Sequence, residues 1–388
     1  MRESGILFPI FSIPSGFGIG CFSKEAYDFV DFLEGAAQGY WQILPVGPTG
    51  YGNSPYQPFS AFAGNPYFIS PEALIEEGLL TRDECNGAFF GSDETRVDYG
   101  AMYENRDKLL RLAFARFDEK ASEEDKKAYK AFLKKENDWL GDYALFTAIK
   151  ASRGGASWLT WEDGLKKRKP EALKKAAEEL KDDIEFVYFK QYEFDRQWHK
   201  LRKYANEKNV KIIGDLPFYV SLDSADCWSH TEVFRMDRDL NPEVVAGCAP
   251  DAFSRTGQLW GNPIYDWDAQ KKAGYDWWVR RIRRNYEFYD VIRIDHFHGF
   301  CEYYAVPFGD ETAENGKLHK GPGMDLVGVL KSWFHDTAFI AEDLGYMTPE
   351  VKKLLADSGF PGMKVLQFAF DVNERRAGRL QNAFLPHT

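Results

Sequence analysis

The sequence predicts an α/β protein of the (β/α)8 TIM-barrel class, with helical insertions between its strands. Three apolar runs of strand length each end in a carboxylate: Val210–Asp215, Val291–Asp295 and Ala338–Glu342. Segments with a helical pattern separate them, and this alternation is typical of parallel strands joined by helices. Because the carboxyl ends of barrel strands meet at one face, we expect the three carboxylates to form one acidic site. An ordinary strand-to-loop turn is the alternative for any one of them, since Asp and Gly are common there.

The composition excludes several classes of partner. The 388 residues carry a formal net charge of −11, which disfavours nucleic acids and anionic membrane surfaces. The sequence has no run of 18 or more apolar residues, the length that would be needed to span a bilayer. The N-terminus lacks the pattern of a signal peptide. Aromatic residues make up 16% of the chain, and their faces suit large cores as well as sugar rings.

Neither a metal nor another cofactor is expected. The five cysteines are scattered without a C-x-x-C spacing, which indicates a reduced cytoplasmic protein without a zinc site. The glycines of residues 15–20 have the wrong spacing for a dinucleotide loop. Asp295, His296 and His298 are close enough in sequence to suggest a metal site, but no further histidine stands at ligand spacing.

The first half of the chain divides into a barrel start and a helical part. An amphipathic helix is predicted over 23–37 and the first barrel strand over 40–45. Residues 71–200 have a mostly helical pattern. We therefore expect three parts: residues 1–70 start the barrel and carry a substrate loop, 71–205 form helical insertion subdomains, and 206–388 continue the catalytic barrel.

The second half resumes the alternation of strands and helices. Strands are predicted over 210–215, 291–295, 338–342 and 363–370, and helices near 224–234, 272–289, 325–336 and 349–357.

Two long segments are predicted to be binding loops. Residues 47–58 are dense in Gly, Pro and Tyr, so helix is excluded and aromatic and hydroxyl groups stand on stiff backbone. Residues 246–263 show no periodicity and mix Asp, Gln, Trp and Asn with Gly. Loops of this length in a compact domain are usually functional, and this composition suits the hydroxyls and faces of sugars.

Together these motifs resemble the 4-α-glucanotransferases (amylomaltases, or disproportionating enzymes) of the α-amylase clan. The resemblance covers essentially the whole chain. Its most specific stretches are Gly52–Tyr56, Gly214–Val220, Gly257–Pro263, Arg293–Phe297 and Ala341–Gly345.

The resemblance implies transfer of an α-1,4-glucan segment with retention, through a covalent glycosyl-enzyme intermediate. Asp295 would be the nucleophile and Glu342 the general acid/base. Retention requires the two carboxyl groups to lie about 5–5.5 Å apart. Burial and nearby negative charge should raise the pKa of Glu342, whereas Arg293, two residues from Asp295 on the same strand face, should favour its ionised form.

The resemblance also implies the substrate-binding residues. His296 would hydrogen-bond glucose hydroxyls, and Asp215 would support the sugar ring or the arginine. Ser54 and Tyr56 would line the donor side, and the acceptor side would be lined by Asp251, Gln258, Trp260 and Asn262.

The sequence departs from the family pattern in two places, and each departure predicts a change in activity or substrate preference. Ala252 stands where the family usually has an aromatic, which predicts altered acceptor or long-chain preference. The chain ends at Thr388, before the position of a third site Asp in the family, so about six of eight strands are accounted for. We therefore expect a chain that stops before the last strands and is poorly active alone.

Other functions are compatible with the same residues. The carboxylates would also serve an α-amylase-type hydrolase of α-1,4-glucans, and the aromatic content would also serve a truncated, non-catalytic glucan-binding protein. The expected partners are malto-oligosaccharides, glucose and α-1,4-glucans, and the expected state is a monomer or weak homodimer in the cytoplasm.

Overall fold

The centre of the molecule is a five-stranded parallel sheet with the strand order β1-β2-β3-β6-β9. The computed structural model describes residues 3–50, 52–93, 95–251, 254–344 and 347–367. The strands of this sheet are β1 (Gly5–Leu7), β2 (Tyr40–Gln42), β3 (Lys211–Leu216), β6 (Val291–Ile294) and β9 (Ala338–Ala341).

The strands that bear the predicted carboxylates are apolar because helices cover the sheet. Ile212, Ile292 and Ile294 are fully buried, as expected for a parallel sheet packed on both faces. At Gly214 a Cβ atom would lie 2.1 Å from the ring of Tyr289, so only glycine allows β3 to pass this close to the chain that leads into β6. This mixed architecture fits a TIM-barrel-like fold.

Helices separate these strands along the chain and follow the last of them. Helix α1 (Lys24–Gly35) lies between β1 and β2. Between β2 and β3 the helices are α2 (Pro71–Glu76), α3 (Arg82–Asn86), α4 (Tyr99–Lys120), α5 (Glu123–Lys135), α6 (Leu140–Ser152), α7 (Asp163–Lys166), α8 (Pro170–Glu179) and α9 (Lys181–Glu207). After β3 they are α10 (Ala225–Ser229), α11 (Trp267–Lys272), α12 (Asp276–Phe288), α13 (Met324–Trp333) and α14 (Pro349–Ser358). Short 3-10 turns are η1 (Ile10–Ser12), η2 (Pro66–Phe68), η3 (Trp158–Thr160), η4 (Thr231–Val233) and η5 (Phe297–Phe300).

Local sequence explains where several helices begin. The side chains of Ser70, Ser122 and Ser224 accept hydrogen bonds from the first turns of α2, α5 and α10. Thr81 and Glu84 form a reciprocal capping box at the start of α3. No described helix is long and apolar enough to cross a membrane.

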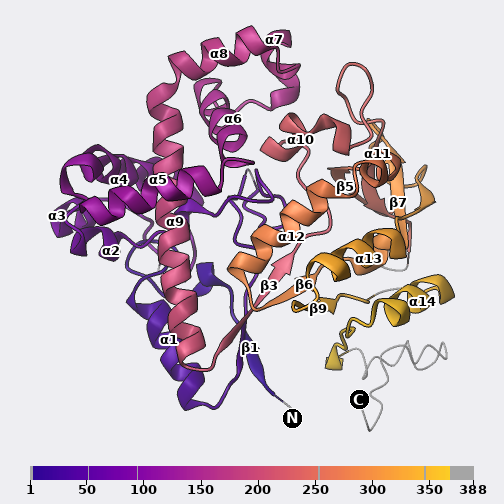
Figure 1. Cartoon of the computed structure of the whole chain (residues 1–388), viewed down its shortest axis with the longest axis horizontal. Helices are drawn as coiled ribbons and strands as arrows, with labels where there is room; N and C mark the ends of the chain where they lie inside the picture. The colour runs from indigo at the N-terminus through magenta and orange to yellow at the C-terminus, as the bar shows by residue number, and fades with distance from the viewer. Residues whose placement is uncertain (1–2, 51, 94, 252–253, 345–346, 368–388) are drawn as a thin grey trace.

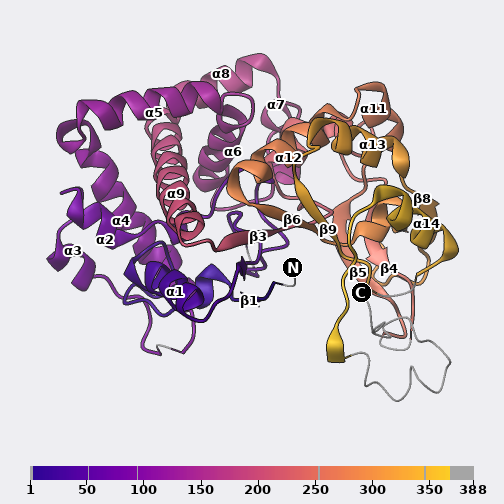
Figure 2. The same ribbon diagram turned by 60° about the horizontal axis from the view of Figure 1, so that its bottom comes forward.

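A second sheet is antiparallel, with the order β5-β4-β7-β8. Its strands are β4 (Val244–Cys248), β5 (Gln258–Pro263), β7 (Glu302–Pro307) and β8 (Lys317–Lys320). The helices α2–α9 gather on one side of the parallel sheet and the antiparallel sheet lies on the other (Figures 1 and 2). The parallel strands between these two regions carry the predicted site.

Most predicted elements are observed, but three predictions were wrong. Residues 40–45 are not the first strand, because β1 precedes them in the sheet. Residues 246–263 are not an irregular loop, because their two ends pair as the hairpin β4–β5. Residues 363–367 do not form the start of a strand, and 368–370 lie outside the described residues. The division into parts at 70 and 205 stays a prediction.

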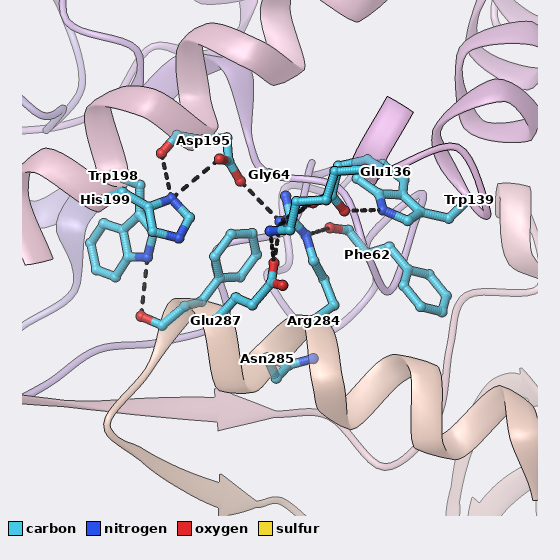
Figure 3. A network of polar contacts seen from close by, with 12 residues as sticks. Phe62, Gly64, Glu136, Trp139, Asp195, Trp198, His199, Arg284, Asn285 and Glu287 are labelled. Carbon is cyan, nitrogen blue, oxygen red and sulfur yellow. Dashed lines mark hydrogen bonds and ion pairs between the residues drawn. The ribbon is translucent and has the colours of Figure 1, made fainter. Parts of the chain in front are cut away.

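A buried polar network joins the helical region to α12 (Figure 3). Arg284 is 3% exposed, and its Nη1 lies 2.9 Å from Asp195, 3.4 Å from Glu136 and 3.2 Å from Glu287. Its Nε donates to the carbonyl of Phe62 at 3.2 Å. One guanidinium therefore connects α9, the end of α5 and α12 to the chain segment that follows the loop of residues 47–58.

Replacing Arg284 with Met should lower the free energy of unfolding by about 3–5 kcal/mol, because it leaves buried carboxylates without their shared cation. The neighbouring Arg283 is exposed, and its guanidinium lies over Trp333 at 5.6 Å. The Arg283→Met variant should therefore lose less than about 1 kcal/mol. Urea denaturation of both variants measures the difference, and equal losses would contradict the assigned role of the network.

Candidate active site

The ends of β3, β6 and β9 bring the predicted carboxylates together. Asp215 on β3 stands beside Arg293 on β6 in the register of the sheet. Just past the strand ends, the N–H of Asp295 donates to the carbonyl of Leu216 at 2.9 Å, and the N–H of Glu342 donates to Ile294 at 3.0 Å. The three acidic residues thus stand at the same edge of neighbouring parallel strands, as the sequence predicted.

Arg293 is the central contact of the site. Its Nη1 donates to Oδ1 of Asp215 and, at 2.9 Å, to Oδ1 of Asp295. The second oxygen of Asp215 accepts from the hydroxyl of Tyr56 at 2.8 Å, and Nε of Arg293 contacts the sulfur of Met363 at 3.3 Å. Asp215 is 2% exposed, so it acts on the site through Arg293 and Tyr56.

The two carboxyl groups proposed for chemistry have different partners. Burial raises the pKa of Glu342, and the charge of Asp295 adds to that rise, while N–H groups of Leu344 and His296 that donate at 2.8 Å oppose it. Burial also raises the pKa of Asp295, and the charge and hydrogen bond of Arg293 oppose it. Arg293 therefore favours the ionised form of Asp295 as expected, but burial has the larger effect on its pKa.

Burial likewise raises the pKa of Asp215 to about 6, against the opposing charge of Arg293. Two of the three carboxyl groups, Asp215 and Asp295, thus share one guanidinium in a poorly hydrated place. Such a cluster of perturbed pKa values in a cleft is typical of a catalytic site.

A cavity of about 530 Å³ lies at these strand ends. Its wall combines the loop after β2, the segment after β3, the hairpin β4–β5 and the ends of β6 and β9. The lining residues are Ser54, Tyr56, Gln57, Pro217, Phe218, Tyr219, Trp260, Asn262, Asp295, His296 and Glu342. A second hollow of about 640 Å³ beside α14 is lined by neither Asp295 nor Glu342. The first cavity is therefore the candidate site.

His296 is held as a neutral imidazole in the cavity wall. Its backbone is left-handed at φ 50°, which is uncommon for a residue other than glycine. Its ring packs on the rings of Trp260 at 5.2 Å and His298 at 4.0 Å between centroids. Burial lowers the pKa of His296 to about 3 and that of His298 to about 4. A neutral imidazole can donate to and accept from sugar hydroxyls.

The metal alternative finds no support in these contacts. Among the described residues, no group of three or more His, Cys, Asp or Glu side chains is placed to hold a metal ion.

The structure brings together nine of the eleven predicted site residues. Seven line the cavity, and Asp215 and Arg293 lie behind it. Asp251 and Gln258 do not line it: Asp251 accepts from the N–H of Ser254 at 2.8 Å, and Gln258 accepts from the indole N–H of Trp260 at 3.1 Å. The predicted specificity position Ala252 lies outside the described residues.

Four lining residues were not predicted: Gln57, Pro217, Phe218 and Tyr219. Each stands within four residues of a predicted site residue, Tyr56 or Asp215. Their position next to a predicted strand end or to the predicted loop was therefore the sequence feature from which they could have been predicted.

The chain is similar to several known proteins over nearly its whole length. The model of the 4-alpha-glucanotransferase family matches residues 8–387. A 4-alpha-glucanotransferase of Clostridium butyricum is 48% identical over 379 residues, which cover 97% of this chain and 76% of that protein. One from Thermus thermophilus is 45% identical over 386 residues, which cover 100% and 75%.

Two solved structures of amylomaltases are also similar to this chain. The amylomaltase from Streptococcus agalactiae in complex with acarbose matches with a TM-score of 0.94 at 41% identity, covering 99% of this chain and 77% of that one. The amylomaltase from Corynebacterium glutamicum matches with a TM-score of 0.76 at 23% identity, which shows the fold alone.

The charge of Asp295 contributes to the raised pKa of Glu342, so the Asp295→Asn variant should have a lower Glu342 pKa than the wild type. Glu342 would then lose its proton at a lower pH. An NMR titration of ¹³C-labelled glutamate side chains measures the shift. The exposed Asp239, replaced by Asn, is the matched control, and an unchanged Glu342 titration in Asp295→Asn would contradict the assigned contact.

Proposed function

Because the chain belongs to the 4-alpha-glucanotransferase family, we propose that its cavity at the ends of β3, β6 and β9 carries out the family's reaction. This reaction passes an α-1,4-glucan segment from a donor malto-oligosaccharide to the 4-hydroxyl of an acceptor glucose or glucan. The observation that carries the assignment to this cavity is the pair Asp295 and Glu342, which line it together from neighbouring strands.

In the first half of the reaction, the carboxylate of Asp295 attacks the anomeric carbon of the donor sugar. The glucosidic C–O bond breaks, and Glu342 gives its proton to the leaving oxygen. In the second half, the acceptor hydroxyl attacks the same carbon, Glu342 takes its proton, and Asp295 leaves as a carboxylate. Two inversions at one carbon retain the α configuration.

The different partners of the two carboxyl groups suit these roles. Arg293 donates to Asp295, which favours the nucleophilic carboxylate. The raised pKa of Glu342 keeps it protonated at a higher pH than an exposed glutamic acid, as a general acid requires. Asp215 and Tyr56 position Arg293 from behind.

The remaining wall would bind the glucan. We assign Ser54 and Tyr56 to the donor side, and Trp260 and Asn262 to the acceptor side, where the Trp260 indole offers a face for a sugar ring. His296 would exchange hydrogen bonds with glucose hydroxyls. Asp251 and Gln258 would contribute to the acceptor side from the hairpin, with Gln258 orienting the indole of Trp260.

Partners and setting follow from the same features. We propose malto-oligosaccharides, glucose and α-1,4-glucans as substrates, with no cofactor. The net charge of −11 supports a monomer or a weak homodimer, because like charge opposes association. All five cysteines are unpaired, which supports a reducing compartment such as the cytoplasm. We also retain the division at residues 70 and 205 as a proposal.

Incubation with maltotriose tests the function. A glucanotransferase forms glucose together with oligomers longer than maltotriose, while the total number of reducing ends stays constant. A rise in reducing ends with only shorter products would instead indicate a hydrolase, and glucan binding without any turnover would indicate a binding protein. Separation of the products by size with a reducing-end assay decides among the three.

The Asp295→Asn variant should bind maltotriose as tightly as the wild type, yet lose turnover by roughly 10⁴-fold or more, because no nucleophile remains to form the intermediate. The Glu342→Gln variant should lose about 10²–10⁴-fold, the contribution of a general acid. Calorimetric binding and initial rates measure the two effects. Wild-type rates in either variant would contradict the roles assigned here.

A further inference from the structure

The loop that follows β2 is closed at its base independently of its tip. Thr49 and Pro58 form an isolated β-bridge, and the N–H of Phe59 donates to the carbonyl of Pro48 at 3.0 Å. The hydroxyl of Tyr103 donates to the carbonyl of Gly50 at 3.3 Å. None of these contacts at the base involves a residue that lines the cavity, whereas the tip contributes Ser54, Tyr56 and Gln57 to the cavity wall.

Two adjacent residues of the tip reach across the cavity to different elements. Tyr56 donates to the buried carboxylate of Asp215 at the end of β3. Gln57 donates from Nε2 to Oδ1 of Asn262 at 3.1 Å, and Asn262 donates from Nδ2 to Oε1 of Gln57 at 3.4 Å. The two amide side chains thus satisfy each other across 205 residues of sequence.

Asn262 is itself firmly held. It is the fifth residue of β5 and 4% exposed, and its Nδ2 also donates to the carbonyl of Val220 at 2.7 Å. The Gln57–Asn262 pair therefore ties the loop to the hairpin β4–β5 and to the segment after β3. These are the parts of the cavity wall that lie beyond the strand ends of the parallel sheet.

We propose that Gln57 and Asn262 form a latch between two walls of the cavity, and that this latch decides how the glycosyl-enzyme intermediate divides between a glucan acceptor and water. The inference rests on the proposed function. Gln57 and Asn262 act here as specificity-determining residues, which hold the wall and take no proton in the reaction.

The chemistry of the intermediate explains why the wall matters. The ester bond between Asp295 and the sugar breaks when a hydroxyl oxygen attacks the anomeric carbon, and Glu342 takes the proton of that hydroxyl. Water and the 4-hydroxyl of a sugar can both react in this way, because each forms one bond to the anomeric carbon and gives one proton to Glu342. The products therefore depend on which of the two reaches the anomeric carbon, and a closed wall limits the entry of water.

The latch is also the weaker of the two attachments of the tip. The bond of Tyr56 to Asp215 involves a carboxyl group, whereas the Gln57–Asn262 bonds join neutral amides. Neutral amides exchange partners readily with sugar hydroxyls, which are themselves donors and acceptors. The hydroxyls of a bound glucan can thus replace the hydrogen bonds of the latch.

Gln57→Met keeps the length of the side chain and removes both amide bonds. We expect this variant to raise the hydrolysed fraction of maltotriose about threefold to tenfold, which corresponds to the loss of a neutral hydrogen bond. Asn262→Leu also removes the hydrogen bond to the carbonyl of Val220, so its effect should be at least as large. The double variant should equal Asn262→Leu, because the latch is already broken in that single variant. Additive effects would show that the two residues bind substrate separately, and an unchanged fraction would overturn the proposal.

Hydrogen exchange followed by mass spectrometry tests the latch without turnover. The backbone amides of residues 53–57 other than Pro55 should exchange faster in Gln57→Met than in the wild type, and those of the core strand β6 should not change. The matched control is Gln38→Met, whose side-chain amide donates only to the carbonyl of Ala36 at 3.0 Å in the described structure. Unchanged exchange at 53–57 would overturn the latch.

The wild-type protein separates the two hypotheses. Oligomers longer than maltotriose from the wild type establish the proposed function whatever the variants do. Their absence would contradict the proposed function, and the exchange rates at residues 53–57 would still decide whether the latch exists.

Discussion

The sharing of Arg293 between Asp215 and Asp295 is the interaction on which the rest of the site depends. Three carboxyl groups and one guanidinium lie where burial raises the pKa of every acid. Removing a cation from such a place would leave charges that neither water nor protein compensates. The arrangement also requires one register between β3 and β6, because a slip of one residue would turn Arg293 to the opposite face.

The surrounding strands and helices hold β3 and β6 in that register and maintain the cavity at their ends. The apolar strands fix the acidic edge, while the helical region and α12 are joined by the buried network around Arg284, which also holds the carbonyl of Phe62. Phe62 follows the loop that carries Tyr56 and Gln57. One buried arginine therefore anchors the segment that follows the substrate loop, and another organises the carboxylates that the tip of the loop reaches.

The sequence could predict the acidic edge because each of its strands is an apolar run that ends in a carboxylate. This pattern can be recognised in each strand alone, without knowing which strands pair with it. The sequence could not predict β1, which has three residues, or the hairpin β4–β5, whose strands contain Gly247, Gly261 and Pro263 and pair only through long-range contacts. The resemblance assigned Asp251 and Gln258 to the acceptor side, but neither lines the cavity, because a hairpin turns part of its residues away from it. Gln57 was missed because its role depends on Asn262, which no local pattern connects to it.

Burial alone cannot give two neighbouring carboxyl groups opposite tasks, since it raises the pKa of both Asp295 and Glu342. The difference must come from their partners. Asp295 receives a charged donor, Arg293, whereas Glu342 receives the neutral N–H groups of His296 and Leu344 and faces the charge of Asp295. A cation stabilises a carboxylate more than a neutral donor does. The same low-dielectric cavity can therefore keep one group ionised for attack and the other protonated for transfer, and the left-handed backbone at His296 helps by directing its N–H to Glu342.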